Sequence, residues 1–164
     1  MNQSRKLNKS QSDNLFLQYN TTKKGLNDDQ FKRLLYDYYK LQQNPTLDRI
    51  FHDLLHIADG TGFFNRHDNL LNKNEFLQIM SKLPMKLSSD ELSIQKDFCR
   101  VIFEMIDKDH SEYLDKKELQ NLFKKIGTKV SKETAKALFS EYDLNGDGQV
   151  SFDEFIQVYL KDKK

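Results

Sequence analysis

Twelve residues from Asp143 to Glu154 carry oxygen atoms at a spacing that suits a hard divalent cation. Side-chain oxygens occupy positions 1, 3, 5, 9 and 12, and a backbone carbonyl is available at position 7; these residues are in turn Asp143, Asn145, Asp147, Ser151, Glu154 and Gln149. Calcium takes about six to eight oxygen ligands at roughly 2.3–2.6 Å, and a chain that wraps round the ion can supply them. Gly148 stands where that wrap needs a positive φ. We predict a calcium site in this loop.

A second segment, from Asp107 to Glu118, has the same spacing with two departures. Its expected ligands are Asp107, Asp109, Ser111, the carbonyl of Tyr113, Asp115 and Glu118. Glu112 replaces the glycine at position 6 and must adopt a left-handed conformation, a strain on the order of 1 kcal/mol. Serine at position 5 is also a weaker ligand than aspartate. We predict that this loop still binds calcium, more weakly than segment 143–154, and a structural loop without metal is the alternative.

Two loops in the first half depart further from this pattern. Segment 20–30 is one residue short, has Lys24 where a ligand should stand, and ends in Gln30, whose amide cannot chelate with two carboxylate oxygens. Segment 59–75 is five residues too long. It contains Arg66 and His67 but retains Asp59, Asp68 and Glu75. We predict no calcium at the first segment, and none at the second unless the chain takes an unusual path.

One short pattern recurs four times, at 26–31, 71–76, 114–119 and 150–155. Each copy has an aliphatic residue, a short polar residue, two free positions, Gln or Glu, and then Phe or Leu. A short polar residue followed three positions later by Glu or Gln is a capping box, which starts a helix. Apolar residues three positions apart precede each polar loop, which is the spacing of one helix face. The chain is therefore predicted to use a helix–loop–helix unit four times.

Other residues mark helix ends and divide the units into pairs. Pro45 after Asn44 indicates a helix start, Ser88 with Glu91 forms a further capping box, and Ser131 caps another helix. A linker near 81–88 separates a first pair with degenerate loops, at 11–82, from a second pair with calcium-competent loops, at 89–162. We predict an all-α fold.

The overall composition excludes some classes of protein. The 164 residues carry 26 basic and 25 acidic groups, a formal net charge of +1, so bulk electrostatics require neither a nucleic acid nor a membrane partner. We find no secretory signal and no stretch near the roughly 18 apolar residues of a membrane span, and Asn2 excludes N-myristoylation. We expect a cytoplasmic protein without a membrane anchor, with cytoskeletal association as an alternative. Cys99 is interpreted as a small buried thiol on a helix.

His52 and His56 stand four residues apart on an expected helix, which is metal-ligand spacing. The segment is reminiscent of zinc enzymes, but Asp53 replaces the glutamate of their motif and no third ligand is evident from the sequence. We interpret the pair as a solvated or packed helix face. No pair of nucleophile and base is apparent elsewhere, so we do not expect an enzyme.

Together, these loops and helices resemble the calmodulin superfamily, in the four-hand arrangement shared by calmodulin, centrins, calcineurin B and myosin light chains. The resemblance covers about 15–160, is specific in the second half and is eroded in the first. It implies EF hands paired in two lobes, with short strands around Leu114 and Val150 pairing between loops, and Leu26 pairing likewise with Leu71. It also implies that a lobe can offer an apolar groove to a partner helix.

Two functions fit these features. The first is a calcium sensor with two sites, at which Mg²⁺ competes, whose second lobe opens and binds an amphipathic helix of a target protein. The surface exposed on opening would draw on Phe103, Met105, Leu119, Leu122, Phe123, Leu138, Phe139, Phe155, Ile156 and Tyr159. The second is a constitutive subunit, light-chain-like or cytoskeletal, with structural or modulatory calcium sites. We favour the sensor because segment 143–154 is well formed, and we expect a monomer.

Overall fold

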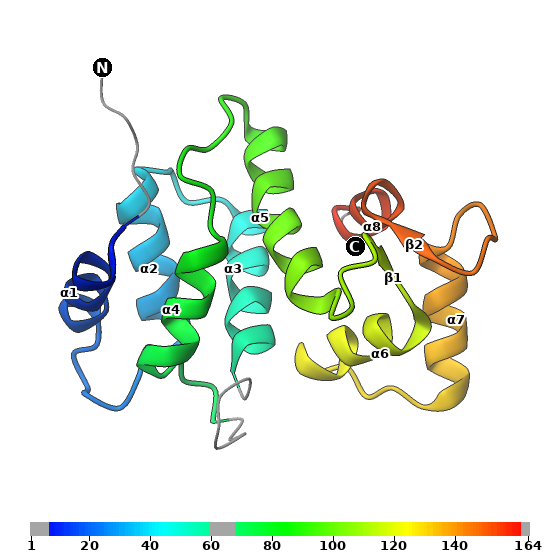
Figure 1. Cartoon of the computed structure of the whole chain (residues 1–164), viewed down its shortest axis with the longest axis horizontal. Coiled ribbons are helices and arrows are strands. Elements are labelled where there is room, and N and C mark those ends of the chain that lie inside the picture. Colours follow the sequence, from blue (N-terminus) through cyan, green and yellow to red (C-terminus); the bar gives the residue numbers. More distant parts are fainter. Residues whose placement is uncertain (1–6, 60–67, 162–164) are drawn as a thin grey trace. The chain divides into compact units, whose positions relative to one another are not determined.

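The computed structural model describes residues 7–59 and 68–161, which contain eight helices and one two-stranded antiparallel sheet (Figure 1). Contacts divide the chain into two compact units, and the division falls between Val101 and Ile102. Each unit is described by itself below. The predicted all-α fold with short β pairings between loops is confirmed.

The first unit contains α1 (Lys9–Tyr19), α2 (Asp28–Tyr39), α3 (Pro45–Ala58), α4 (Lys73–Lys82) and the first part of α5 (Glu91–Ile106). Helix α2 packs on α3, and α4 packs on both α1 and α3. Phe16 contacts Phe76 and Phe51 contacts Phe98, with ring centroids 5.3 Å and 4.8 Å apart. Because Phe98 belongs to α5, this helix supplies part of the core of the first unit.

Leu26 and Leu71 join the two loops of the first unit in an antiparallel bridge. Each N–H donates to the carbonyl of the other residue, at 2.9 Å and 2.8 Å. Gly25 approaches this bridge so closely that a Cβ on it would lie 2.9 Å from the carbonyl oxygen of Leu71, and its φ is +138°. Glycine is therefore required beside the bridge. The predicted pairing of the two leucines is confirmed.

The second unit contains the end of α5, β1 (Tyr113–Leu114), α6 (Lys116–Lys125), α7 (Lys132–Tyr142), β2 (Val150–Ser151) and α8 (Phe152–Tyr159). The strands pair Tyr113 with Ser151 and Leu114 with Val150, as the sequence indicated. Phe155 lies at the centre of the core and contacts three rings, those of Phe103, Tyr142 and Tyr159. These packed rings hold α5, α7 and α8 around the paired loops.

Capping boxes start the helices that follow the four loops. The N-caps are Asn27, Asn72, Asp115 and Ser151, and each is paired with the Gln or Glu three positions later. In each box the cap side chain accepts from the backbone N–H of the third helical residue, whose own side chain accepts from the cap N–H. The repeated pattern therefore sets where α2, α4, α6 and α8 begin.

The start of α5 differs from the sequence prediction. The side chain of Asp90 accepts from the N–H of Ser93 at 2.9 Å, so Asp90 caps the helix that begins at Glu91. Ser88 instead donates its backbone N–H to the carboxylate of Asp97 at 2.7 Å. The predicted capping box of Ser88 with Glu91 is therefore wrong. The cap is Asp90, two residues later, because Asp90 directly precedes the first residue of the helix.

Candidate metal centres

The loop between α5 and α6 gathers three carboxylates around one point. One oxygen each of Asp107, Asp109 and Glu118 lies within 4.8 Å of the other two, and Asp107 and Glu118 are buried. Two oxygens on opposite sides of a calcium ion, each at roughly 2.3–2.6 Å from it, stand about 4.6–5.2 Å apart. The three oxygens therefore fit around a single ion of this size.

Glu118 ties the two ends of this loop together. Its Oε1 accepts from the N–H of Lys108 at 2.8 Å, and its Oε2 accepts from the N–H of Asp115 at 3.0 Å. The hydroxyl of Ser111 donates to the carbonyl of Tyr113 at 3.0 Å, so the oxygens at positions 5 and 7 are adjacent. Asp115, at position 9 of the loop, is the N-cap of α6. The residue at this position often binds calcium through a water molecule, so its side chain can cap the helix as well.

Position 6 of this loop has the backbone conformation expected from the sequence. Glu112 has a φ of +67° and donates its N–H to Asp107 Oδ2 at 3.0 Å. His110 is also left-handed, with a φ of +57°. The loop therefore folds as a tight turn in spite of the missing glycine, and it retains the associated strain.

The loop between α7 and α8 holds its first carboxylate with three backbone N–H groups. Asp143 Oδ1 accepts from Gly146 at 2.8 Å and from Asp147 at 3.1 Å, and Oδ2 accepts from Gly148 at 3.0 Å. The amide of Asn145 donates to Asp147 Oδ2 at 3.0 Å. These bonds wrap the chain around Asp143, and the φ of +85° at Gly148 permits the turn.

Glu154 occupies the last position of this loop and is buried on the first turn of α8. Its Oε1 accepts from the N–H groups of Leu144 and Asn145, both at 3.1 Å. Its Oε2 accepts from the N–H and the hydroxyl of Ser151, at 2.9 Å and 2.7 Å. Burial alone would raise the pKa of Glu154, but the hydrogen bonds from Ser151, Asn145 and Leu144 outweigh it and lower that pKa. The carboxylate is thus held ionised.

In both loops the carboxylates accept hydrogen bonds from backbone N–H groups. In 107–118 they are Asp107, Asp109 and Glu118, whose oxygens converge. In 143–154 they are Asp143, Asp147 and Glu154. An ion entering either loop must compete with these hydrogen bonds. The chemistry of both donor sets is all oxygen and fits calcium. The ligand assignments remain predictions.

The loop before α2 closes through its own side chains. Asn20 Oδ1 accepts from the N–H of Gly25 at 3.2 Å, and the amide of Gln30 donates to the hydroxyl of Thr21 at 2.8 Å. The same Gln30 accepts from the N–H of Asn27 at 3.0 Å. Gln30 therefore bridges the beginning and end of the loop, as a chelating glutamate bridges its loop through an ion. This supports the expectation that calcium does not bind there.

The long loop between α3 and α4 is described only at its ends, because residues 60–67, including Arg66 and His67, lie outside the described residues. Asp59 is 1% exposed, and its Oδ2 accepts from the N–H of Asn69 at 2.9 Å. Asp68 accepts from the N–H of Leu70, and Glu75 completes the capping box of α4. Each of the three retained acidic residues thus makes a hydrogen bond to the backbone of its own loop.

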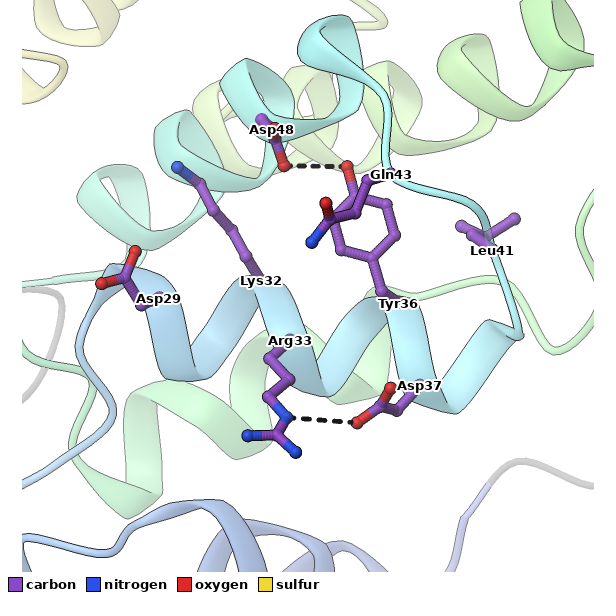
Figure 2. A pocket seen from close by; sticks show the side chains of 8 residues that line it. All are labelled: Asp29, Lys32, Arg33, Tyr36, Asp37, Leu41, Gln43 and Asp48. Atoms are coloured by element: carbon purple, nitrogen blue, oxygen red, sulfur yellow. Dashed lines mark hydrogen bonds and ion pairs between the residues drawn. The ribbon is translucent and has the colours of Figure 1, made fainter.

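A depression of about 530 Å³ lies along α2 and the start of α3 (Figure 2). Tyr36 donates to Asp48 at 2.8 Å, and Arg33 pairs with Asp37 at 3.7 Å, so charges of both signs line the depression and pair with one another. Burial raises the pKa of Tyr36 to about 12, which keeps its phenol protonated at neutral pH.

Comparison with known proteins gives matches over the second half and beyond. Residues 95–160 match the family described as an EF-hand domain pair. Over 106 residues, 65% of this chain, it is 28% identical to cell division control protein 31 of Saccharomyces cerevisiae. It is 29% identical over 87 residues, 53% of the chain, to putative calmodulin-like protein 6 of Oryza sativa subsp. japonica, and 29% identical over 104 residues, 62% of the chain, to alpha-actinin A of Dictyostelium discoideum.

The chain spans 61%, 49% and 12% of the lengths of these three relatives, respectively. No helix in the described part of the chain is long and apolar enough to cross a membrane. The matched segment 95–160 contains both loops in which oxygen ligands were predicted, with the paired strands between them. Residues 95–160 therefore form an EF-hand domain pair, and the chain is similar in sequence to calmodulin-like proteins without matching a single one of them.

Proposed function

We propose that the chain is a calcium sensor whose second unit binds two calcium ions, one at 107–118 and one at 143–154. The observation that carries this proposal is the position of Glu118 and Glu154. Each stands on the first turn of an exiting helix and accepts backbone N–H groups from the beginning of its loop. The helix start and the loop are therefore already linked through the carboxylate that an ion would engage.

Calcium would change these links and move the helices. Bidentate binding needs both oxygens of Glu154, yet Oε1 is held by Leu144 and Asn145 and Oε2 by Ser151. An ion that takes both oxygens must break these bonds, and α8 would shift with its first turn. Glu118 Oε1 accepts from Lys108 and Oε2 from Asp115, so an ion that takes both oxygens would likewise shift α6. Because β1 and β2 join the two loops, binding at one loop would influence the other.

The surface that would open is closed in this structure. Of the ten apolar residues predicted to line it, eight are buried, namely Phe103, Met105, Leu119, Leu122, Phe123, Phe155, Ile156 and Tyr159. Leu138 and Phe139 are half-buried. Movement of α6 and α8 would expose part of this set to the apolar face of a target helix. The proposal includes binding in the presence of Mg²⁺, which competes for oxygen sites, and a monomeric cytoplasmic chain.

The test is calcium-dependent exposure of apolar surface, measured with the dye ANS at physiological Mg²⁺. We expect ANS fluorescence to rise on calcium addition for the wild type and to stay low for Glu154→Gln. Gln30→Glu is the matched control in the first unit, and its response should equal that of the wild type. A wild-type protein that binds calcium without a rise in ANS fluorescence would contradict the sensor and favour a buffer or a constitutive subunit.

A constitutive subunit is the second candidate, and the first unit favours it. Its loop 20–30 is closed by hydrogen bonds of Asn20, Thr21 and Gln30, so in this role the unit would keep the same conformation with and without calcium. Such a unit would hold a partner permanently. Extraction of partners with calcium or with a chelator separates the two candidates, because a partner retained under both conditions supports the constitutive role.

A further inference from the structure

Two histidines of α3 and one aspartate in the first turn of α2 lie together in the first unit, outside the two loops predicted to bind calcium. The imidazole rings of His52 and His56 are in contact, with centroids 4.3 Å apart and planes at 61°. Asp28 Oδ1 lies 3.1 Å from His52 Nδ1. No local sequence pattern indicates this third group, since Asp28 is 24 residues from His52.

Asp28 fixes the orientation of the His52 ring. Its other oxygen, Oδ2, pairs with Lys32 at 2.6 Å, one turn further along α2. With Lys32 on Oδ2, the carboxylate offers Oδ1 as an acceptor, and we assign to His52 the tautomer in which Nδ1–H donates to it. With the proton on Nδ1, the lone pair of His52 is on Nε2, on the opposite side of the ring from Asp28. A carboxylate behind a histidine in this way is the usual outer partner of a metal-ligating imidazole.

His56 supplies the second nitrogen. Residues four apart on a helix present their side chains on the same face, and the 4.3 Å ring contact confirms that the two imidazoles are adjacent. Both histidines are half-buried, and the His52 side chain is 42% exposed, so an ion and its waters can reach them.

We propose that His52 and His56 bind one Zn²⁺ ion, with Asp28 as the outer partner of His52 and water at the remaining positions. Asp28 is not a third direct ligand, because the three groups do not converge as the described cluster in 107–118 does. The nitrogen ligands select Zn²⁺ or Cu²⁺ over calcium and magnesium, which prefer oxygen. The site would tie the first turn of α2 to α3, independently of the calcium loops.

The test is a zinc titration of the full chain at pH 7.5 by competition with a chromophoric zinc indicator, in excess calcium so that the calcium loops are occupied. We expect one zinc site in the wild type and its loss in His52→Ala and in His56→Ala. Asp28→Asn should weaken zinc binding by about 10–100-fold without abolishing it, as expected for an outer partner. His110→Gln is the control histidine variant and should bind zinc as the wild type does.

A second measurement identifies the ligating atoms. Imidazole ¹⁵N chemical shifts recorded with and without zinc should move at Nε2 of His52, while Nδ1 remains protonated. Circular dichroism of each variant checks that the helices are retained, so a loss of zinc binding is not a loss of fold. Zinc binding that is unchanged in both His52→Ala and His56→Ala, or the absence of a one-to-one site in the wild type, would overturn the proposal.

Discussion

At the scale of single residues, the two predicted calcium loops can be compared in their backbone conformation at position 6. Glu112 and Gly148 occupy equivalent positions and both have left-handed backbones, with φ of +67° and +85°. A Cβ added to Gly148 would have no heavy atom within 4 Å, so its cost would be conformational and not steric. The sequence predicted the left-handed Glu112, because the turn requires this conformation whatever residue occupies it.

This comparison predicts opposite effects of two substitutions on stability. Glu112→Gly should raise the free energy of unfolding of the second unit by about 1 kcal/mol, and Gly148→Ala should lower it by about the same amount, because each changes left-handed strain. Denaturant unfolding in a calcium chelator measures both. If both substitutions lowered the free energy of unfolding, contacts of the Glu112 side chain, and not its backbone conformation, would determine the effect of replacing it.

Cys99 gives a second prediction at this scale. The thiol is fully buried, and burial raises its pKa to about 12. Because the thiolate is the reactive form, the folded protein should react with iodoacetamide much more slowly than the denatured protein at pH 8. Mass spectrometry of both samples over time measures the two rates. Equal rates would mean that α5 opens readily or that Cys99 is exposed in solution.

At the scale of elements, the sequence predicted most of what starts each helix and missed what depends on the fold. The capping boxes and the pairing of Leu114 with Val150 are local patterns, and both are present. The cap of α5 was misplaced because Ser88 and Asp90 are both good caps and only the helix start decides between them. The contact of Asp28 with His52 depends on the packing of α2 on α3, which no local pattern encodes.

The cap of α5 can be tested by a pair of alanine substitutions. Asp90→Ala should lower the free energy of unfolding measurably, because the N–H of Ser93 loses its acceptor. Ser88→Ala should have little effect, since Ser88 contributes its backbone N–H and not its hydroxyl to the bond with Asp97. Thermal unfolding of the two variants measures the difference. A larger loss of stability for Ser88→Ala than for Asp90→Ala would indicate that Ser88 caps the helix, as the sequence predicted.

At the scale of the whole molecule, the two units differ in what closes their loops. In the first unit Gln30 and Asn20 close the loop with hydrogen bonds, whereas the second unit concentrates carboxylates in its two loops. Calcium should therefore stabilise the second unit and leave the first nearly unchanged. The candidate ligands can be proposed from sequence because their spacing is local, whereas the N–H groups that hold Glu118 and Glu154 become known only from the fold.

Amide hydrogen exchange tests this difference between the units. At a calcium concentration 100 times the dissociation constants, each of the two ions should stabilise the second unit by about 2.7 kcal/mol, so together they slow exchange of its most protected amides by about 10⁴-fold. Amides of α2 and α3 should exchange at the same rate with and without calcium. Equal slowing in both units would indicate that the first unit also binds calcium or unfolds together with the second.

The most direct test of the central claim is a calorimetric calcium titration at physiological Mg²⁺ of the wild type, Glu154→Gln and Glu118→Gln. We predict two wild-type sites with dissociation constants of about 10⁻⁷–10⁻⁵ M. Each variant should lose its own site or bind there at least about tenfold more weakly, because one amide oxygen replaces a chelating carboxylate. Wild-type protein without calcium binding, or variants that titrate as the wild type does, would contradict the assignment of 107–118 and 143–154 as calcium sites.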